Sequence, residues 1–124
     1  MAKTNVSGLK RILNAFRYSA LGYIAAWRHE AAFRQEVYLS IVLTPFAFII
    51  GASFLHTALL MASLVLILIV ELLNSAIEAA VDRISDDHHH LSARAKDIGS
   101  AAVLTAFGLS FLLWAGALLD TLVN

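Results

Sequence analysis

The chain has 124 residues, of which 60% are hydrophobic and 15% charged, and its mean hydropathy is +0.76. A soluble domain typically has about 45–50% apolar and about 25% charged residues, so this composition excludes an ordinary soluble domain and indicates a membrane protein. Nine basic residues balance nine acidic ones, which gives no sign of a nucleic-acid partner, and the absence of Cys excludes disulfides and thiolate metal sites.

The first predicted element is a helix over about residues 7–28. Apolar residues recur at helical spacing from Leu9 to Trp27, whereas Lys10 and Arg17 take the other side. A basic amphipathic helix beside a membrane span most simply lies in the membrane interface. Taken alone, this helix is equally well interpreted as a plain anchor with no chemistry.

Residues 37–70 contain no Asp, Glu, Lys or Arg. A single helix of these 34 residues would be about 51 Å long, whereas a hydrocarbon core is only about 30 Å thick. The chain must therefore fold back, and residues 51–57, which mix Gly, Ser, His and Thr, are the expected turn. This predicts transmembrane spans at about 37–54 and 57–81, and a third uncharged run predicts a span at about 98–119.

The expected fold class is an all-α membrane protein, residues 1–124 forming one domain with a surface helix and three transmembrane helices. Every Lys and Arg lies before the first span or between the second and third: Lys3, Lys10, Arg11, Arg17, Arg28, Arg34, Arg83, Arg94 and Lys96. Because cytoplasmic loops carry the excess of basic residues, the N-terminus and residues 82–97 are predicted to be cytoplasmic and the C-terminus to lie opposite.

A row of polar residues ends the second span. Glu71, Asn74, Ser75, Glu78 and Asp82 share one helical face, and residues 57–70 reach only about 21 Å, so Glu71 is expected inside the hydrocarbon. Carboxylates at such depth usually mark function or a buried partner. Two acids two turns apart repel unless a divalent cation or a proton lies with them. The alternative is a polar seam that joins helices through Asn74 and Ser75.

Other polar clusters are expected at the same depth. Glu30, Arg34 and Glu36 join the surface helix to the first span, where such a run usually means a solvated boundary face. Lys96 and Asp97 open the third span, where a helix N-terminus favours phosphate, although basic residues there are also topology signals.

Three adjacent histidines, His88 to His90, point about 100° apart on a helix and so do not chelate one ion well. A solvated loop is the favoured interpretation, and a nucleotide contact is the alternative. Pro45 is interpreted as a tolerated kink in the first span. His56 and Trp114 are expected at the far membrane interface.

This layout favours one chemistry. Carboxylates suited to Mg²⁺, basic groups suited to phosphate, and a glutamate at the lipid boundary gather on one predicted surface. Phosphoryl transfer needs positioning, charge neutralisation and a group that deprotonates or orients the attacking hydroxyl. A base just below the headgroups would meet the hydroxyl of a lipid, so the layout predicts lipid phosphorylation.

Three long motifs carry a family resemblance. AAWRHEAAFRQE at residues 25–36, VELLNSAIEAAVDR at 70–83 and LSARAKDIGSAAV at 91–103 resemble the bacterial integral-membrane diacylglycerol kinase, in order and over nearly the whole chain. The resemblance implies a homotrimer in the bacterial inner membrane with active sites between neighbouring subunits. It also implies transfer of the ATP γ-phosphate to sn-1,2-diacylglycerol, giving phosphatidate, with Mg²⁺ as cofactor.

The resemblance further implies roles for single residues. Glu71 matches the catalytic base, and Glu30 and Glu78 match metal-binding carboxylates. The implied ATP contacts are Arg11, Tyr18, Glu30, Asn74, Glu78, Asp87, His88, His89, Lys96 and Asp97. The implied lipid contacts are Arg11, Ala32, Phe33, Arg34, Gln35, Glu36, Glu71, Ser100 and Trp114.

Two alternatives remain open from the sequence. The sister kinase that phosphorylates undecaprenol shares the glutamate-asparagine-glutamate helix, although residues 94–100 look more like the diacylglycerol branch. A small proton-coupled transporter or a non-catalytic membrane scaffold belongs to another class. A transporter would need its glutamate accessible from both sides, and the 51–57 turn and the tail offer only His56 and Asp120 as ionisable partners.

Overall fold

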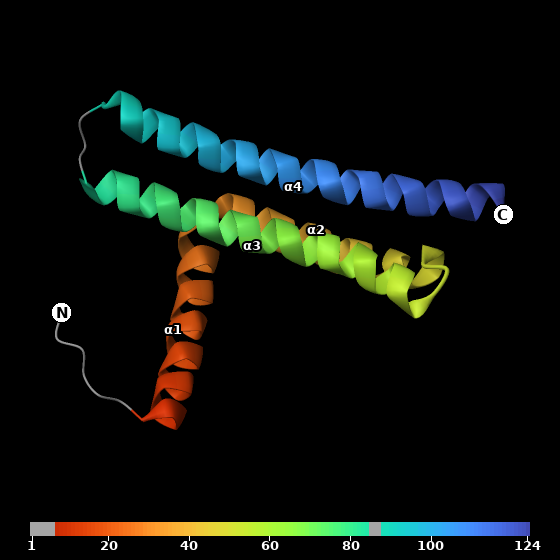
Figure 1. The fold of residues 1–124 in the computed structure, drawn as a ribbon, viewed down its shortest axis with the longest axis horizontal. Coiled ribbons are helices and arrows are strands. Elements are labelled where there is room, and N and C mark those ends of the chain that lie inside the picture. Colours follow the sequence, from red (N-terminus) through yellow and green to blue (C-terminus); the bar gives the residue numbers. More distant parts are fainter. Residues whose placement is uncertain (1–6, 85–87) are drawn as a thin grey trace.

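The computed structural model describes residues 7–84 and 88–124 as four helices with no strand among them. They are α1 (Gly8–His29), α2 (Ala31–Ile50), α3 (Phe54–Ile84) and α4 (His90–Val123). The last three lie side by side with α3 in contact with both others, and α1 projects from this layer at a steep angle (Figure 1). The all-α class expected from the sequence is confirmed.

The three bundle helices, α2, α3 and α4, are long and apolar enough to cross a membrane. Their outward surfaces carry large apolar side chains, and Phe48, Ile49 and Phe111 are each more than two-thirds exposed. In water such a surface would drive association, whereas in a bilayer it faces lipid or another helix. The predicted membrane-protein class therefore agrees with the distribution of side chains over the fold.

The helices extend beyond the predicted spans on the side of the charged residues. α2 begins at Ala31 rather than at residue 37, and α4 begins at His90 rather than at 98. A charge-free run marks only the part of a helix that suits hydrocarbon, and the backbone hydrogen bonds continue into the polar region. Pro45 lies within a continuous α2, as expected for a proline tolerated inside a span.

The turn between α2 and α3 is shorter than predicted and is closed by side chains. The backbone N–H of Ala52 donates to His56 Nδ1 over 3.1 Å, and the N–H of His56 donates to Ser53 Oγ over 3.1 Å. These bonds satisfy amide groups at the start of α3 that have no partner within the helix. His56, expected as an interface residue, is thus part of the turn itself.

The tightest packing lies at the end of the bundle near this turn. Ala47, Leu60 and Ala117, one from each bundle helix, have essentially no exposed surface. Nearby, Trp114 Nε1 donates to Ser63 Oγ over 3.2 Å, and the hydroxyls of Ser63 and Ser110 lie 2.9 Å apart. Apolar and polar contacts together therefore join α3 to α4 at this end.

Candidate active site

The polar face of α3 points into the bundle. Glu71, Asn74 and Ser75 are only 5–9% exposed, whereas Leu73 and Ile77 on the same stretch of helix are 60% and 41% exposed. A helix in water shows the opposite pattern, with its charged residues outside. α3 thus keeps polar groups inside and offers apolar ones to lipid, which is the arrangement expected of functional polar residues in a membrane.

Glu36 of α2 lies against Glu71. Its side chain is only 7% exposed, and that of Glu71 only 5%. The two carboxyl groups are close enough to act on each other electrostatically. The solvated boundary face predicted for Glu36 is therefore wrong, because the start of α2 turns this residue toward α3 rather than toward water.

Two more carboxylates, Glu30 and Glu78, act electrostatically on Glu71. Glu30 sits at the corner between α1 and α2, and Glu78 follows two turns after Glu71 on α3; both are half-buried. Asn74 Nδ2 donates to Glu78 Oε1 over 3.4 Å. Acids from α3, from α2 and from the α1–α2 corner therefore gather at one level of the fold, as the sequence predicted for Glu71 and Glu78.

The corner that carries Glu30 is fixed by α2. Extended backbone at Glu30 (φ −118°, ψ 101°) ends α1, and Arg34 Nη1 donates to the carbonyl of Trp27 over 2.6 Å. A guanidinium at this position also suits the negative end of the α1 dipole. The rings of Trp27 and Tyr38 meet edge to face at 5.6 Å. Arg34 of α2 thus bonds to the end of α1. This bond favours the direction in which α1 leaves the bundle.

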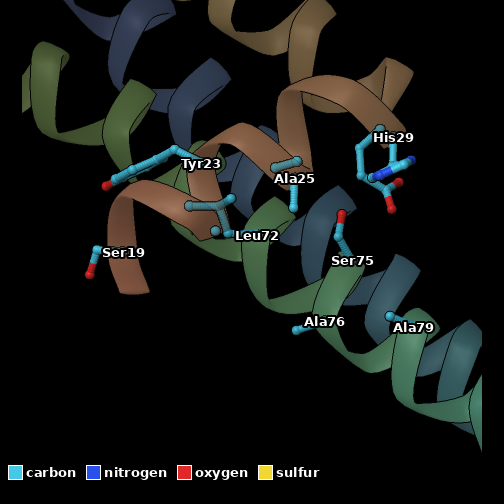
Figure 2. A pocket seen from close by; sticks show the side chains of 11 residues that line it. Ser19, Tyr23, Ala25, His29, Leu72, Ser75, Ala76 and Ala79 are labelled. Carbon is cyan, nitrogen blue, oxygen red and sulfur yellow. The ribbon is translucent and has the colours of Figure 1, made fainter. Parts of the chain in front are cut away.

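A cavity of about 490 Å³ opens between α1 and α3 beside these acids. Figure 2 shows Ser19 and Tyr23 at one end of it and His29 and Ser75 at the other. Small side chains form much of the wall between them, which leaves room for a ligand. The full lining is Ser19, Gly22, Tyr23, Ala25, Ala26, His29, Glu30, Leu72, Ser75, Ala76 and Ala79.

Three buried polar atoms near the acids have no hydrogen-bond partner in the described part of the chain. They are Glu36 Oε2, Asn74 Oδ1 and Ser75 Oγ. Leaving a buried polar atom unpaired costs about 1–3 kcal/mol, and native proteins keep few such atoms. Their concentration around Glu71 marks this region as one where a ligand would supply the missing partners.

The donor set fits Mg²⁺ only in part. Within residues 7–84 and 88–124, no three His, Asp or Glu side chains converge closely enough to hold a metal ion. Mg²⁺, however, is usually bound by one or two carboxylates together with waters and substrate phosphates. Glu30 and Glu78 match that mode, in which a nucleotide would supply the remaining oxygens.

The basic residue expected to contact the nucleotide has a partner on α3. Lys96 Nζ lies 2.6 Å from Asp82 Oδ1, with both side chains substantially exposed. Solvent screens such a pair, so it adds little to stability and leaves the ammonium accessible to phosphate. Asp97, next along α4, is exposed.

The histidines begin α4. His89 precedes the helix and accepts the N–H of Leu91 at Nδ1 over 3.1 Å, and its ring stacks on that of His90, the first helical residue. The solvated-loop prediction is therefore wrong for His90, because the cap at His89 lets the helix begin there. It is confirmed for His89, which is exposed and lies outside the helix. His88 is exposed, and Asp87, a predicted ATP contact, lies outside the described residues.

Several predicted contacts are not brought to Glu71 within one chain. Arg11 is on α1, 19 residues before Glu30 at the α1–α2 corner, which corresponds to about 28 Å along the helix. Tyr18, also on α1, is exposed. Trp114 lies 14 residues beyond Ser100, about 21 Å along α4, and bonds to Ser63. Of the remaining lipid contacts, Phe33 is buried whereas Ala32, Gln35 and Ser100 are exposed.

One residue of the site escaped the sequence reasoning. Gly99 of α4 is buried against Asn74, and a Cβ at this position would collide with Asn74 Oδ1. Nothing in the sequence separates it from the other glycines of the last span, because the close approach is made by two segments far apart in the chain. Its glycine character was the only available signal.

The fold and this site define a class, a small helical membrane protein with a buried carboxyl cluster between its spans. The family model described as prokaryotic diacylglycerol kinase matches residues 17–118. The chain is 56% identical to diacylglycerol kinase of Pseudomonas aeruginosa, covering 91% of this chain and 92% of that protein. Identity is 47% to the Escherichia coli K12 enzyme of the same name (89% and 90%) and 41% to that of Haemophilus influenzae (90% and 95%). The chain therefore belongs to the prokaryotic diacylglycerol kinase family, and it is an enzyme of that class.

Arg34→Ala is expected to loosen the α1–α2 corner, because it removes the bond to the Trp27 carbonyl. Amide hydrogen exchange in the last two turns of α1 should become roughly tenfold faster, in line with the loss of about 1.5 kcal/mol for a bond from a charged donor. Arg28→Ala removes a charge from the same corner and keeps that bond, so exchange there should stay slow. Equal exchange in both variants would show that Arg34 does not hold the corner.

Proposed function

We propose that this protein is an ATP-dependent lipid kinase of the bacterial inner membrane that phosphorylates the free hydroxyl of sn-1,2-diacylglycerol, giving phosphatidate. The observation that carries the proposal is the buried Glu36–Glu71 pair, which lies on helices long and apolar enough to span a membrane. A base at that depth reaches a hydroxyl held at the lipid boundary, not one dissolved in water. The names of the related enzymes agree with this acceptor.

Glu71 is proposed as the general base. As the acceptor O–H bond breaks, its proton passes to a Glu71 carboxylate oxygen, while the acceptor oxygen bonds to the γ-phosphorus and the bond from that phosphorus to the β–γ bridging oxygen breaks to release ADP. Glu36 is proposed to support this role as the buried neighbour of Glu71 on α2. General-base assistance of this kind typically contributes about 10²–10⁴-fold in rate.

Glu30 and Glu78 are proposed to hold Mg²⁺. Bound there with ATP, the ion would neutralise charge on the phosphate oxygens. Asn74 orients Glu78 by donating to its Oε1. Lys96, Asp97 and the histidines at the start of α4 are proposed as nucleotide contacts, which agrees with their exposure on the same side of the fold.

The complete site is proposed to form between neighbouring subunits of a homotrimer. Arg11 and Tyr18 lie in the N-terminal half of α1, the half farther along the chain from the corner at Glu30, so one chain alone does not bring them to Glu71. Extensive exposed apolar surface on α2 and α4 is compatible with further helix contacts. Diacylglycerol would then lie along residues 32–36, Ser100 and the apolar flank toward Trp114.

The proposed topology follows the basic residues. α1 would lie in the cytoplasmic interface with Lys10 and Arg17 toward the headgroups, and the α3–α4 connection would also be cytoplasmic. The C-terminus lies at the same end of the bundle as the α2–α3 turn, opposite that connection (Figure 1). The active site would therefore open toward cytoplasmic ATP.

An ATP-dependent labelling assay in mixed micelles tests the function. With γ-labelled ATP, Mg²⁺ and equal amounts of diacylglycerol and undecaprenol, label should appear in phosphatidate on a thin-layer plate. Label mainly in undecaprenyl phosphate would instead identify the sister activity. Absence of label in either lipid, from protein shown to be folded by its helical circular dichroism, would contradict lipid kinase activity altogether.

Glu71→Gln is expected to lower the turnover of lipid labelling by roughly 10²–10⁴-fold, because the amide does not accept the acceptor proton. The amide still lies beside Glu36, so thermal unfolding in micelles should change little. Asp120→Asn, which removes an exposed acid at the other end of α4, is the matched control and should retain activity. Near-normal turnover in Glu71→Gln would remove Glu71 from the role of base.

Glu78→Gln is expected to raise the Mg²⁺ concentration needed for half-maximal activity by roughly tenfold or more, because it removes a charged ligand. Its side-chain oxygen still accepts from Asn74, which preserves the local geometry. The measurement is a Mg²⁺ titration at saturating ATP and lipid, run beside Glu71→Gln. Glu71→Gln should lose turnover without a shift of its Mg²⁺ curve. If the Mg²⁺ curves of Glu78→Gln and of the unchanged protein superimpose, Glu78 does not bind the metal.

A further inference from the structure

Gly99 of α4 lies against Asn74, the residue that donates to Glu78 of the proposed metal site. A Cβ at this position would overlap Asn74 Oδ1 and would lie 3.3 Å from Asn74 Cγ. The same helix has two further glycines, Gly108 and Gly116, where an added Cβ would meet nothing within 4 Å among the described residues. Of these three positions in α4, only Gly99 therefore depends on the absence of a side chain.

The Asn74 carboxamide lies between Glu78 and α4. Asn74 Nδ2 donates to Glu78 Oε1 over 3.4 Å. Asn74 Oδ1 lies against Gly99 and has no hydrogen-bond partner in residues 7–84 and 88–124. The space left by the missing Cβ of Gly99 therefore accommodates this oxygen.

A second contact joins α4 to α3 beside the same site. Lys96, one turn before Gly99, lies 2.6 Å from Asp82, which is one turn after Glu78. Glu78 is thus bracketed along α3 by two residues that touch α4, Asn74 and Asp82. A side chain at position 99 would push α4 away or turn the carboxamide, and either movement would release Glu78 from the Asn74 amide.

We propose that Gly99 is a positioning residue of the enzyme: its missing side chain lets α4 press on Asn74, so that Asn74 Nδ2 holds the Glu78 carboxylate in the direction required for binding Mg²⁺. The metal part of this inference rests on the proposed function, whereas the contact between Gly99, Asn74 and Glu78 does not. Gly99 touches neither substrate nor metal, and it acts only through Asn74.

Gly99→Ala is expected to raise the half-saturating Mg²⁺ concentration about tenfold, a change typical of losing a group that orients a metal ligand. Gly108→Ala, the matched control on α4, should leave the Mg²⁺ curve in place. In an Asn74→Ala background the added methyl group meets no carboxamide, so Gly99→Ala should cause no further shift. An unmoved curve in Gly99→Ala, or an equal shift in the Asn74→Ala background, would overturn the proposal.

A second measurement needs no change at position 99 and no Mg²⁺. The side-chain amide signal of Asn74 in a ¹⁵N–¹H NMR spectrum should report a bond to a carboxylate and should move toward the position of a free amide in Glu78→Ala. An Asn74 signal that does not respond to Glu78→Ala would overturn the positioning role even in a fully active lipid kinase. If the labelling assay fails, a responsive signal still supports the Gly99–Asn74–Glu78 contact.

Discussion

The structure depends on one constraint: a carboxyl group between membrane-spanning helices must have a partner. Glu71 and Glu36, both buried, are neighbours that act on each other electrostatically. Their proximity marks the level at which α2 and α3 carry polar groups inward, and the remaining polar groups of the site are arranged around it.

Two joints place the other acids around this pair. At the corner between α1 and α2, Arg34 holds the end of α1 and so sets the position of Glu30. Along α3 and α4, Asn74 lies against Gly99 and donates to Glu78, and Lys96 pairs with Asp82 one turn further along. Neither joint relies on a large apolar core, because the tightest apolar packing lies at the opposite end of the bundle. The bundle is therefore closed by apolar contacts at one end and organised by polar contacts at the other.

Much of this fold could be predicted, because a helix that spans a bilayer needs a long uncharged run of residues, and such runs can be read from the sequence. Charge-free runs predicted three spans, and the spacing of Glu71, Asn74 and Glu78 predicted a shared face. Glu36 was expected in water, since its neighbours Arg34 and Gln35 look like a boundary and only the direction of α2 shows otherwise. Two further features could not be predicted from the sequence, because both depend on three-dimensional geometry. The role of Gly99 depends on the close approach of two segments far apart in the chain, and the capping role of His89 depends on the geometry of a single turn.

The lengths of the two longest helices have a consequence for the membrane around them. α3 has 31 residues and α4 has 34, which correspond to about 46 Å and 51 Å, whereas hydrocarbon is about 30 Å thick. Because the turn before α3 is tight, little of the helix length that exceeds the hydrocarbon thickness lies at that end. Most of the extra length therefore lies toward Glu78 and Lys96. Bilayer thickness then decides how far Glu71 sits below the headgroups. The thickness of the surrounding lipid would thus tune access of water and of a lipid hydroxyl to the proposed base, without any change in the protein.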